Sequence, residues 1–158
     1  MQPQSQALQP HLEYVFELNG VLDPTVVIGE TPHGLKRMVP ITGGSFEGKS
    51  LRGSVVGGGA DWQVVRPDGV MELHALYMLM TDDGVRIQVE NNGLRHGPEA
   101  VMQRLAAGDA VDPAEYYFRA APRFSAPAGK YDWLNRSLFL CTGSRAPRGI
   151  RLWFYRVV

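Results

Sequence analysis

The stretch VVRPDGVMELHALYMLMTDDGVRIQVE, residues 64–90, decides the fold class. Pro67-Asp68-Gly69 and Asp82-Asp83-Gly84 are tight-turn sequences, and β-favouring residues flank both of them. Residues 70–80, between the two turns, predict one long strand. Consecutive strands joined by tight turns form a β-meander. The stretch therefore predicts the middle of an antiparallel sheet.

The rest of the chain repeats this pattern of strands and turns. In residues 12–18 every second side chain is large and apolar, which predicts a half-buried strand. Gly97-Pro98-Glu99 begins a predicted helix that Gly108 ends, and Asp112-Pro113 begins a single capped turn. Further strands are predicted at residues 26–28, 35–41, 51–56, 60–66, 85–90, 118–124, 137–141 and 150–157.

These elements predict an all-β fold with one short helix: an antiparallel meander closed into a lipocalin-like β-barrel with an interior ligand cavity. Closure removes exposed strand edges, and a barrel of about eight strands can hold one small ligand. Residues 1–10 are polar and contain two prolines, which predicts a disordered tail. Residues 11–158 are then expected to form a single barrel domain.

Composition narrows the expected partners and location. The formal net charge is zero, so bulk electrostatics favour neither nucleic acid nor a membrane. The basic residues concentrated in 119–158 are interpreted as strands beside acidic ones. The N-terminus lacks signal-peptide features and no apolar run could span a bilayer, which predicts a cytoplasmic protein. A small organic molecule is the expected partner, and assembly into a homo-oligomer stays open.

A nucleotide-binding pattern lies in residues 43–50. GGSFEGKS matches the phosphate-loop pattern G-x-x-x-x-G-K-[ST] at every position. That loop needs a helix after it, so that backbone amides and the helix dipole meet the phosphates. The residues that follow, 51–57, are rich in glycine and β-branched side chains and do not favour a helix. We therefore predict a loop or hairpin here that binds no nucleotide.

Apart from this pattern, the sequence contains no residue spacing typical of a metal or cofactor site. No two of His11, His33, His74 and His96 have the i, i+2 or i, i+4 spacing of common metal sites. We predict no metal site and no cofactor. Cys141 is interpreted as a small buried hydrophobic residue, because no activating base can be identified for it.

The strand at 70–80 has two different faces. Its odd-numbered face is apolar and is interpreted as packed core, whereas Glu72 and His74 on the even-numbered face suit either solvent or a polar cavity. Asp61, beside Trp62 near the start of the preceding strand, is either a turn acid or a cavity carboxylate whose pKa apolar walls raise. The aromatic segments 116–119 and 131–136 either line a pocket or close one end of the barrel.

The same segments carry a family resemblance. GGSFEGKSLRG, GGADWQVVRPDGV, TDDG, YYFR-x-x-P-x-F and YDWLNRSLF, in this order, resemble the family catalogued as domain of unknown function 3237, over about residues 12–157. The resemblance implies a single-domain, lipocalin-like barrel, mostly bacterial or fungal, with small organic substrates. Members often carry Asp-Ala-Arg-Tyr where this chain has His74-Ala75-Leu76-Tyr77. That departure implies a pocket with different charge and proton chemistry, if the even-numbered face points inward.

Two functions of different classes fit these residues. The first is a cofactor-independent acid–base enzyme, a lyase, isomerase or cyclase, acting on a small, partly aromatic or carbonyl-containing molecule held in the barrel. Asp61 and His74 are expected to share the cavity, since a short turn joins their strands, and one of them would be the base. The alternative is a non-catalytic small-molecule binding or carrier protein. The expected catalytic residues are Asp61, His74 and Tyr117, and the expected substrate-binding residues are Glu72, Leu76, Met78, Trp62, Arg119, Trp133 and Asn135.

Overall fold

The computed structural model describes residues 6–158, which form nine strands, one α-helix and two short 3-10 helices. The strands are β1 Leu12–Leu22, β2 Val26–Thr31, β3 Gly34–Gly48, β4 Arg52–Val65, β5 Met71–Thr81, β6 Arg86–His96, β7 Tyr117–Ser125, β8 Phe139–Ala146 and β9 Gly149–Val157. The helices are α1 Glu99–Ala106, η1 Pro113–Glu115 and η2 Asp132–Arg136.

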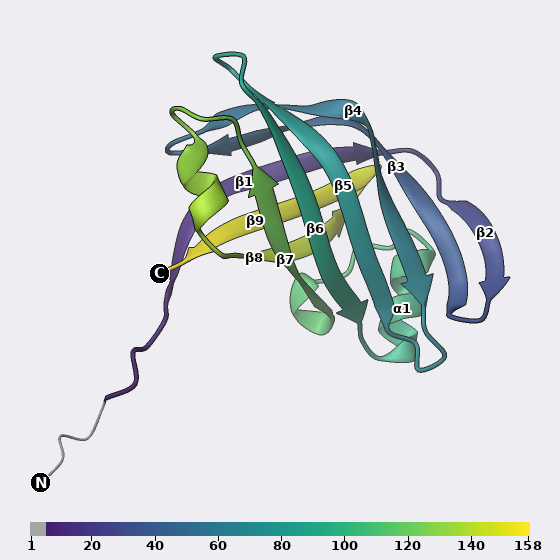
Figure 1. The fold of residues 1–158 in the computed structure, drawn as a ribbon. Helices are drawn as coiled ribbons and strands as arrows, with labels where there is room; N and C mark the ends of the chain where they lie inside the picture. The colour runs from purple at the N-terminus through teal and green to yellow at the C-terminus, as the bar shows by residue number, and fades with distance from the viewer. Residues whose placement is uncertain (1–5) are drawn as a thin grey trace, which may run out of the picture.

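Eight of the strands form a closed antiparallel barrel. The hydrogen-bonded order is β1-β9-β8-β7-β6-β5-β4-β3-β2, and β1 also pairs with β3, which closes the ring. The short strand β2 continues along the same edge of β3 and lies beyond the ring (Figure 1). The predicted all-β barrel with one short helix is confirmed. Closure leaves few strand edges open to other chains.

Two strands are longer than the sequence predicts. Residues 35–41 and 43–48 belong to the single strand β3, and residues 52–56 and 60–65 to the single strand β4. The register of β4 shifts between Val56 and Ala60, across three glycines. Four steps along β4, from Val56 to Ala60, oppose two steps along β5, and the pairing continues on both sides, so the glycines mark a bulge rather than a strand end.

The segment that matches the phosphate-loop pattern is part of a hairpin. Gly43–Gly48 lies in β3 between β1 and β4, and the Gly48 N–H donates to the Leu51 carbonyl oxygen at 2.9 Å across the turn. The chain then enters β4, and no helix follows. The predicted hairpin is thus present, although most of the segment is strand. That it binds no nucleotide stays a prediction.

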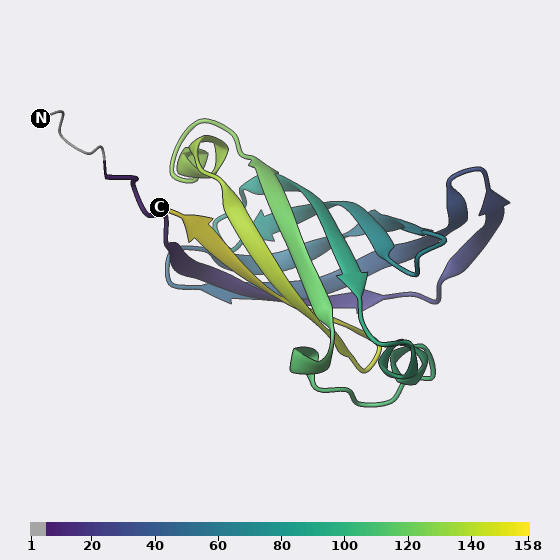
Figure 2. The ribbon, with the colours of Figure 1, turned by 90° about the horizontal axis from the view of Figure 1, so that it is seen from below.

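The two ends of the barrel are filled differently. Phe16 stacks on Phe154 with ring centroids 4.3 Å apart, and Phe46 and Phe124 pack against Phe16 at 5.5 Å and 6.1 Å. This phenylalanine cluster fills the end near η2. Figures 1 and 2 place α1 and η1 near the opposite end, where the interior is open. Within residues 6–158, no helix is long and apolar enough to cross a membrane.

Candidate functional site

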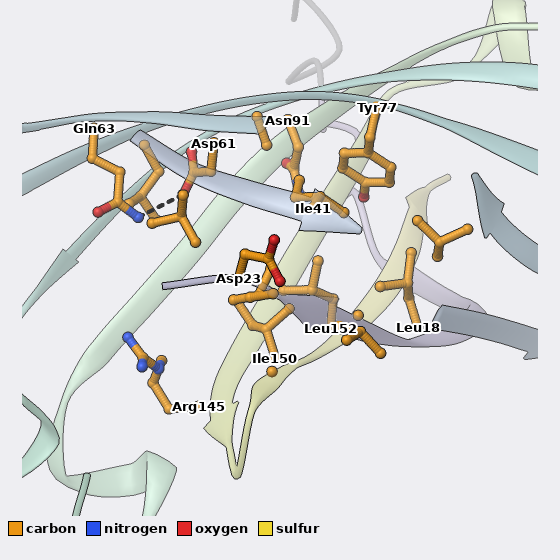
Figure 3. Close-up of a pocket in the computed structure, with 18 of the residues that line it drawn as sticks. Leu18, Asp23, Ile41, Asp61, Gln63, Tyr77, Asn91, Arg145, Ile150 and Leu152 are labelled. Atoms are coloured by element: carbon orange, nitrogen blue, oxygen red, sulfur yellow. Dashed lines mark hydrogen bonds between the residues drawn. The ribbon is translucent and has the colours of Figure 1, made fainter. Parts of the chain in front are cut away.

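A cavity of about 570 Å³ occupies the half of the barrel away from the phenylalanine cluster. Its mouth is marked by exposed lining residues, namely Asp23 and Thr25 after β1 and Arg145 and Arg148 at the β8–β9 turn. Figure 3 shows the mixture of apolar and polar side chains inside. The apolar wall includes Leu18, Val39, Ile41, Val55, Leu73, Ala75, Phe118, Ala120, Ile150 and Leu152. The cavity has the size of a small organic molecule.

The odd-numbered face of β5 lines this cavity. Leu73, Ala75 and Tyr77 belong to the wall, and Asp61 of β4 pairs directly with Ala75. Residues directly opposite each other on neighbouring strands point to the same side of a sheet, so Asp61 also points inward. The odd-numbered face, interpreted from sequence as packed core, is thus partly the wall of an open cavity.

Asp61 is a partly buried carboxyl group held from two directions. The Gln63 Nε2 donates to Oδ2 at 2.7 Å, and the backbone N–H of His74 donates to Oδ1 at 3.0 Å. Burial raises the pKa of Asp61 above its ordinary value, although these hydrogen bonds and the charges of Arg95 and Arg37 oppose the shift. Asp61 therefore keeps a proton to a higher pH than an exposed aspartate.

A short polar chain fixes the orientation of this carboxyl group. The Arg37 Nε donates to the Gln63 Oε1 at 2.7 Å, which leaves the Gln63 amide N–H to face Asp61 (Figure 3). Gln63 itself is buried and lines the cavity. Because both ends of the Gln63 amide are engaged, the carboxyl group of Asp61 has little freedom to rotate.

Three other polar groups in the wall have buried atoms without a partner. Among the described residues, the Tyr77 hydroxyl, the Asn91 Oδ1 and the Arg95 Nε accept or donate no hydrogen bond. Burial raises the pKa of Tyr77 well above its ordinary value, so its hydroxyl stays a neutral donor. Buried polar atoms are normally paired, and unpaired ones around a cavity suit a ligand.

Cys141 lies behind this wall. It is 1% exposed and free, and burial raises the pKa of its thiol to about 12. A thiol with such a pKa holds almost no thiolate at neutral pH and is a poor nucleophile. The interpretation of Cys141 as a buried hydrophobic residue agrees with this environment.

The expectation that Asp61 and His74 share the cavity is wrong. His74 pairs with Trp62, whereas Asp61 pairs with Ala75, so their side chains lie on opposite faces of the sheet. The exposed His74 ring contacts the Asn92 Oδ1 on the outer surface. Only the backbone N–H of His74 reaches Asp61. The face carrying an acid and an imidazole meets solvent, because the cavity wall is built from the more apolar face.

The other expected site residues also lie outside the cavity lining. Tyr117 is on the outer surface, where its ring stacks on His96 with centroids 4.9 Å apart and Arg119 lies over it at 5.4 Å. Asn135 joins η2 to the loop after β7 through two 2.8 Å hydrogen bonds with the Ala126 backbone. The remaining residues are Glu72, Leu76, Met78 and Trp62 on the outward face of β4 and β5, and Trp133 in η2, which packs near Phe139 at the closed end.

Sequence reasoning missed Gln63, Tyr77, Asn91 and Arg95. The alternation along β6 could have identified two of them. Asn91 and Arg95 are odd-numbered, like the fully buried Ile87 and Val89, and so lie on the same face of the strand. In the same way Gln63 shares the parity of Asp61. Treating the polar residues on each buried face as inward-pointing, together with their apolar neighbours, would have identified them. Within residues 6–158, no group of three His, Cys, Asp or Glu side chains could hold a metal ion.

Comparison with known proteins places this site in a family. The profile of the family described as "Protein of unknown function (DUF3237)" matches residues 10–157, which confirms the resemblance seen in the motifs. A UPF0311 protein of Clostridium acetobutylicum is 39% identical over 146 residues, covering 92% of both chains. The crystal structure of a conserved protein of unknown function from Rhodopseudomonas palustris aligns with a TM-score of 0.92 at 35% identity, covering 96% of this chain and 100% of that one. A hydroalkoxylation enzyme of Penicillium herquei is 31% identical over 131 residues, covering 83% of this chain and 72% of the enzyme.

Proposed function

This chain belongs to the DUF3237 family, and from that premise we propose that it is a cofactor-independent enzyme. In the proposed reaction Asp61 transfers a proton to or from a small, partly aromatic or carbonyl-containing molecule in the barrel. The observation that carries the proposal is the Asp61 carboxyl group, which points into a largely apolar cavity and has a raised pKa. An acid of this kind is protonated where an exposed aspartate is already ionised, which suits general acid catalysis.

The hydroalkoxylation enzyme of Penicillium herquei supports one reaction class in particular. Hydroalkoxylation adds a hydroxyl group across a carbon–carbon double bond. In the proposed reaction the protonated Asp61 gives its proton to one alkene carbon, and a hydroxyl oxygen of the same molecule bonds to the other. The hydroxyl proton then passes to the Asp61 carboxylate, which restores the acid. The product is a cyclic isomer of the substrate, and nothing is oxidised or reduced.

The surroundings of Asp61 support this role. The Gln63 amide and the His74 backbone N–H hold the carboxyl group in one orientation, so its proton has a defined direction. The Tyr77 hydroxyl has no protein partner and is a suitable donor to a substrate oxygen. A substrate that fills the cavity would displace water from the apolar wall, which would protect a cationic intermediate from capture by solvent.

The test is turnover of ortho-prenylated phenols in D2O, followed by NMR. The wild-type protein is expected to form the cyclic ether with one deuterium on the newly saturated carbon. Asp61→Asn should lower turnover by about 10²–10⁴-fold, the usual contribution of a general acid. His74→Ala is the matched control, because it changes a titratable side chain on the outer face of the neighbouring strand, and it should keep wild-type turnover.

Two outcomes would contradict the proposal. Turnover that Asp61→Asn leaves unchanged would remove Asp61 from the chemistry. Binding of the phenols without any deuterium incorporation would favour the alternative, a non-catalytic carrier, for which the cavity alone is sufficient.

A further inference from the structure

Arg95 is a buried cation without a buried counter-charge. Its side chain is 5% exposed, lines the cavity, and contacts the Met71 Sδ at 3.2 Å and the Phe118 ring at 5.7 Å. Neither of these partners carries a negative charge. Within residues 6–158 no carboxylate lies within ion-pair distance of Arg95, and its Nε has no acceptor.

Asp61 is the acid whose charge acts on Arg95, and it makes no ion pair with it. Both oxygens of Asp61 already accept hydrogen bonds from other groups. Burial, together with the charges of Arg145 and Arg37, lowers the pKa of Arg95 to about 10, which still leaves it charged at neutral pH. The lining as a whole carries Arg95, Arg145 and Arg148 against Asp23 and Asp61.

An unpaired buried charge opposes folding, so a chain that keeps one requires a reason. The cross-strand neighbours of Arg95, Met71 and Phe118, are apolar, and a residue such as methionine would pack against them without the desolvation penalty. Departures of this kind from the best-packed core are expected at functional sites. Arg95 lines a cavity of molecular size, so its side chain forms part of the surface that a ligand would meet.

We propose that the molecule that enters the cavity carries an ionised oxygen group, a carboxylate or a phenolate, that binds the Arg95 guanidinium, with Arg145 at the mouth attracting it. The inference rests on the proposed function and adds the substrate class. A guanidinium offers N–H groups in a planar fork that suits such an oxygen group. If that group is the phenolate that cyclises, its proton has already passed to solvent, and Asp61 regains a proton from solvent after it has protonated the alkene carbon.

The first test compares charged and neutral probes of the same shape by isothermal titration calorimetry at pH 7. The wild-type protein should bind 2-naphthoate at least about tenfold more tightly than 2-naphthamide, a modest gain for a charge-assisted contact. Arg95→Met should erase that preference. Arg86→Gln is the control, because Arg86 lies on the outward face of the same strand, and it should keep the preference.

A second experiment, with a phenol as the probe, distinguishes a carboxylate ligand from a phenolate ligand. 4-Nitrophenol absorbs visible light when ionised, so binding at Arg95 should increase that absorbance at a pH where the free phenol is mostly neutral. Preference for naphthoate without this spectral change assigns the site to carboxylates, and the spectral change with weak naphthoate binding assigns it to phenolates. Absence of both effects in the wild-type protein would overturn the proposal.

A second readout distinguishes ligand binding from a structural role. Arg95→Met should raise the melting temperature of the ligand-free protein, since it removes an unpaired buried charge, and 2-naphthoate should raise it only in the wild type. A lower melting temperature with an unchanged naphthoate preference would make Arg95 structural. If Arg95→Met does not fold, Arg95→Gln takes its place, and a retained preference there also overturns the proposal.

Asp61→Asn separates this inference from the proposed enzyme function. The variant should keep the naphthoate preference of the wild type, because Asp61 is not the anion site. If the preference is present and Asp61→Asn does not affect turnover, the catalytic proposal fails and the anion site stands. If Asp61→Asn abolishes turnover and Arg95→Met still prefers naphthoate, the anion site fails alone.

Discussion

Asp61 and Arg95 are the two ionisable groups on which the proposed chemistry rests. They lie on β4 and β6, with β5 between them, and both side chains point into the same cavity. Burial acts on them in opposite ways, because it raises the pKa of the carboxyl group and lowers that of the guanidinium. In both cases burial shifts the equilibrium towards the neutral form, although Arg95 is still charged at neutral pH. A bound anion would reverse this for Arg95, whereas Asp61 would remain a proton donor.

The raised pKa of Asp61 predicts a pH-dependent difference in stability. The folded protein holds this proton to a higher pH than the unfolded chain, so Asp61 makes the protein less stable as pH rises from about 4 through its folded pKa. Asp61→Asn has no such proton to lose. The melting temperature of Asp61→Asn minus that of the wild type should therefore increase between pH 4 and pH 7, measured by differential scanning calorimetry.

The control for this pH series is Asp109→Asn, which changes an exposed acid in the loop after α1. The melting temperature of this variant minus that of the wild type serves as the baseline for removing one surface carboxylate, against which the Asp61→Asn series is read. A difference that falls with pH for Asp61→Asn would mean that the hydrogen bonds from Gln63 and His74 outweigh burial.

The strands explain how much the sequence could predict. The meander, its turns, the helix α1 and the capped turn at η1 follow from local patterns, and all are present. Alternation along β5 also separates the residues of its two faces correctly. Alternation does not say which face points inward. The more polar face was a reasonable candidate for a reactive cavity, and it meets solvent because this cavity has a mostly apolar wall.

Contacts between distant strands were beyond prediction for a physical reason. The pairing of β1 with β3 and β9 brings together residues that no local pattern connects. The polar partners of Asp61 are closer in sequence: Gln63 is two residues along β4, Arg37 lies on the neighbouring strand β3 and the N–H of His74 on β5. Alternation marks Gln63 as facing the same side as Asp61, whereas no local pattern shows which atoms of these groups meet.

Strand β3 offers a test of why its glycines are needed. A Cβ on Gly48 would lie 2.1 Å from the Val15 carbonyl oxygen and 2.7 Å from the Phe16 Cβ, in the neighbouring strand β1. Gly48→Ala should destabilise the protein by about 1–3 kcal/mol, the usual cost of overpacking. Denaturant titration would measure this as a lower midpoint with an unchanged slope.

Gly43 provides the matched control in the same strand. A Cβ there meets no atom within 4 Å, and its backbone is not left-handed. Gly43→Ala should be neutral or stabilise by up to about 1 kcal/mol, because alanine restricts the unfolded chain. Equal losses for both variants would show that the close approach of β1 does not determine the effect.

At the scale of the whole molecule, the ring of strands joins the beginning of the described chain to its end. His11 and Val158 exchange two backbone hydrogen bonds of 2.9 Å, and β1 pairs with β9 on one side and β3 on the other (Figure 1). The cavity depends on this closure, since β1, β9 and the turns at their ends supply part of its wall. A partial opening of the barrel would therefore remove the site as well as the fold.

This closure predicts that the protein unfolds as one cooperative unit. No half of the ring has a core of its own, because the cluster around Phe16 takes members from both ends of the chain. The calorimetric and van't Hoff enthalpies should agree, and deletion of residues 1–10 should leave the melting temperature nearly unchanged. Deletion of residues 1–16 should abolish the transition, since it removes Phe16 and opens the edges of β3 and β9.

Limited proteolysis could contradict this prediction. If a cut in the loop at residues 107–112 left two stably folded pieces, the ring would not be a single folding unit.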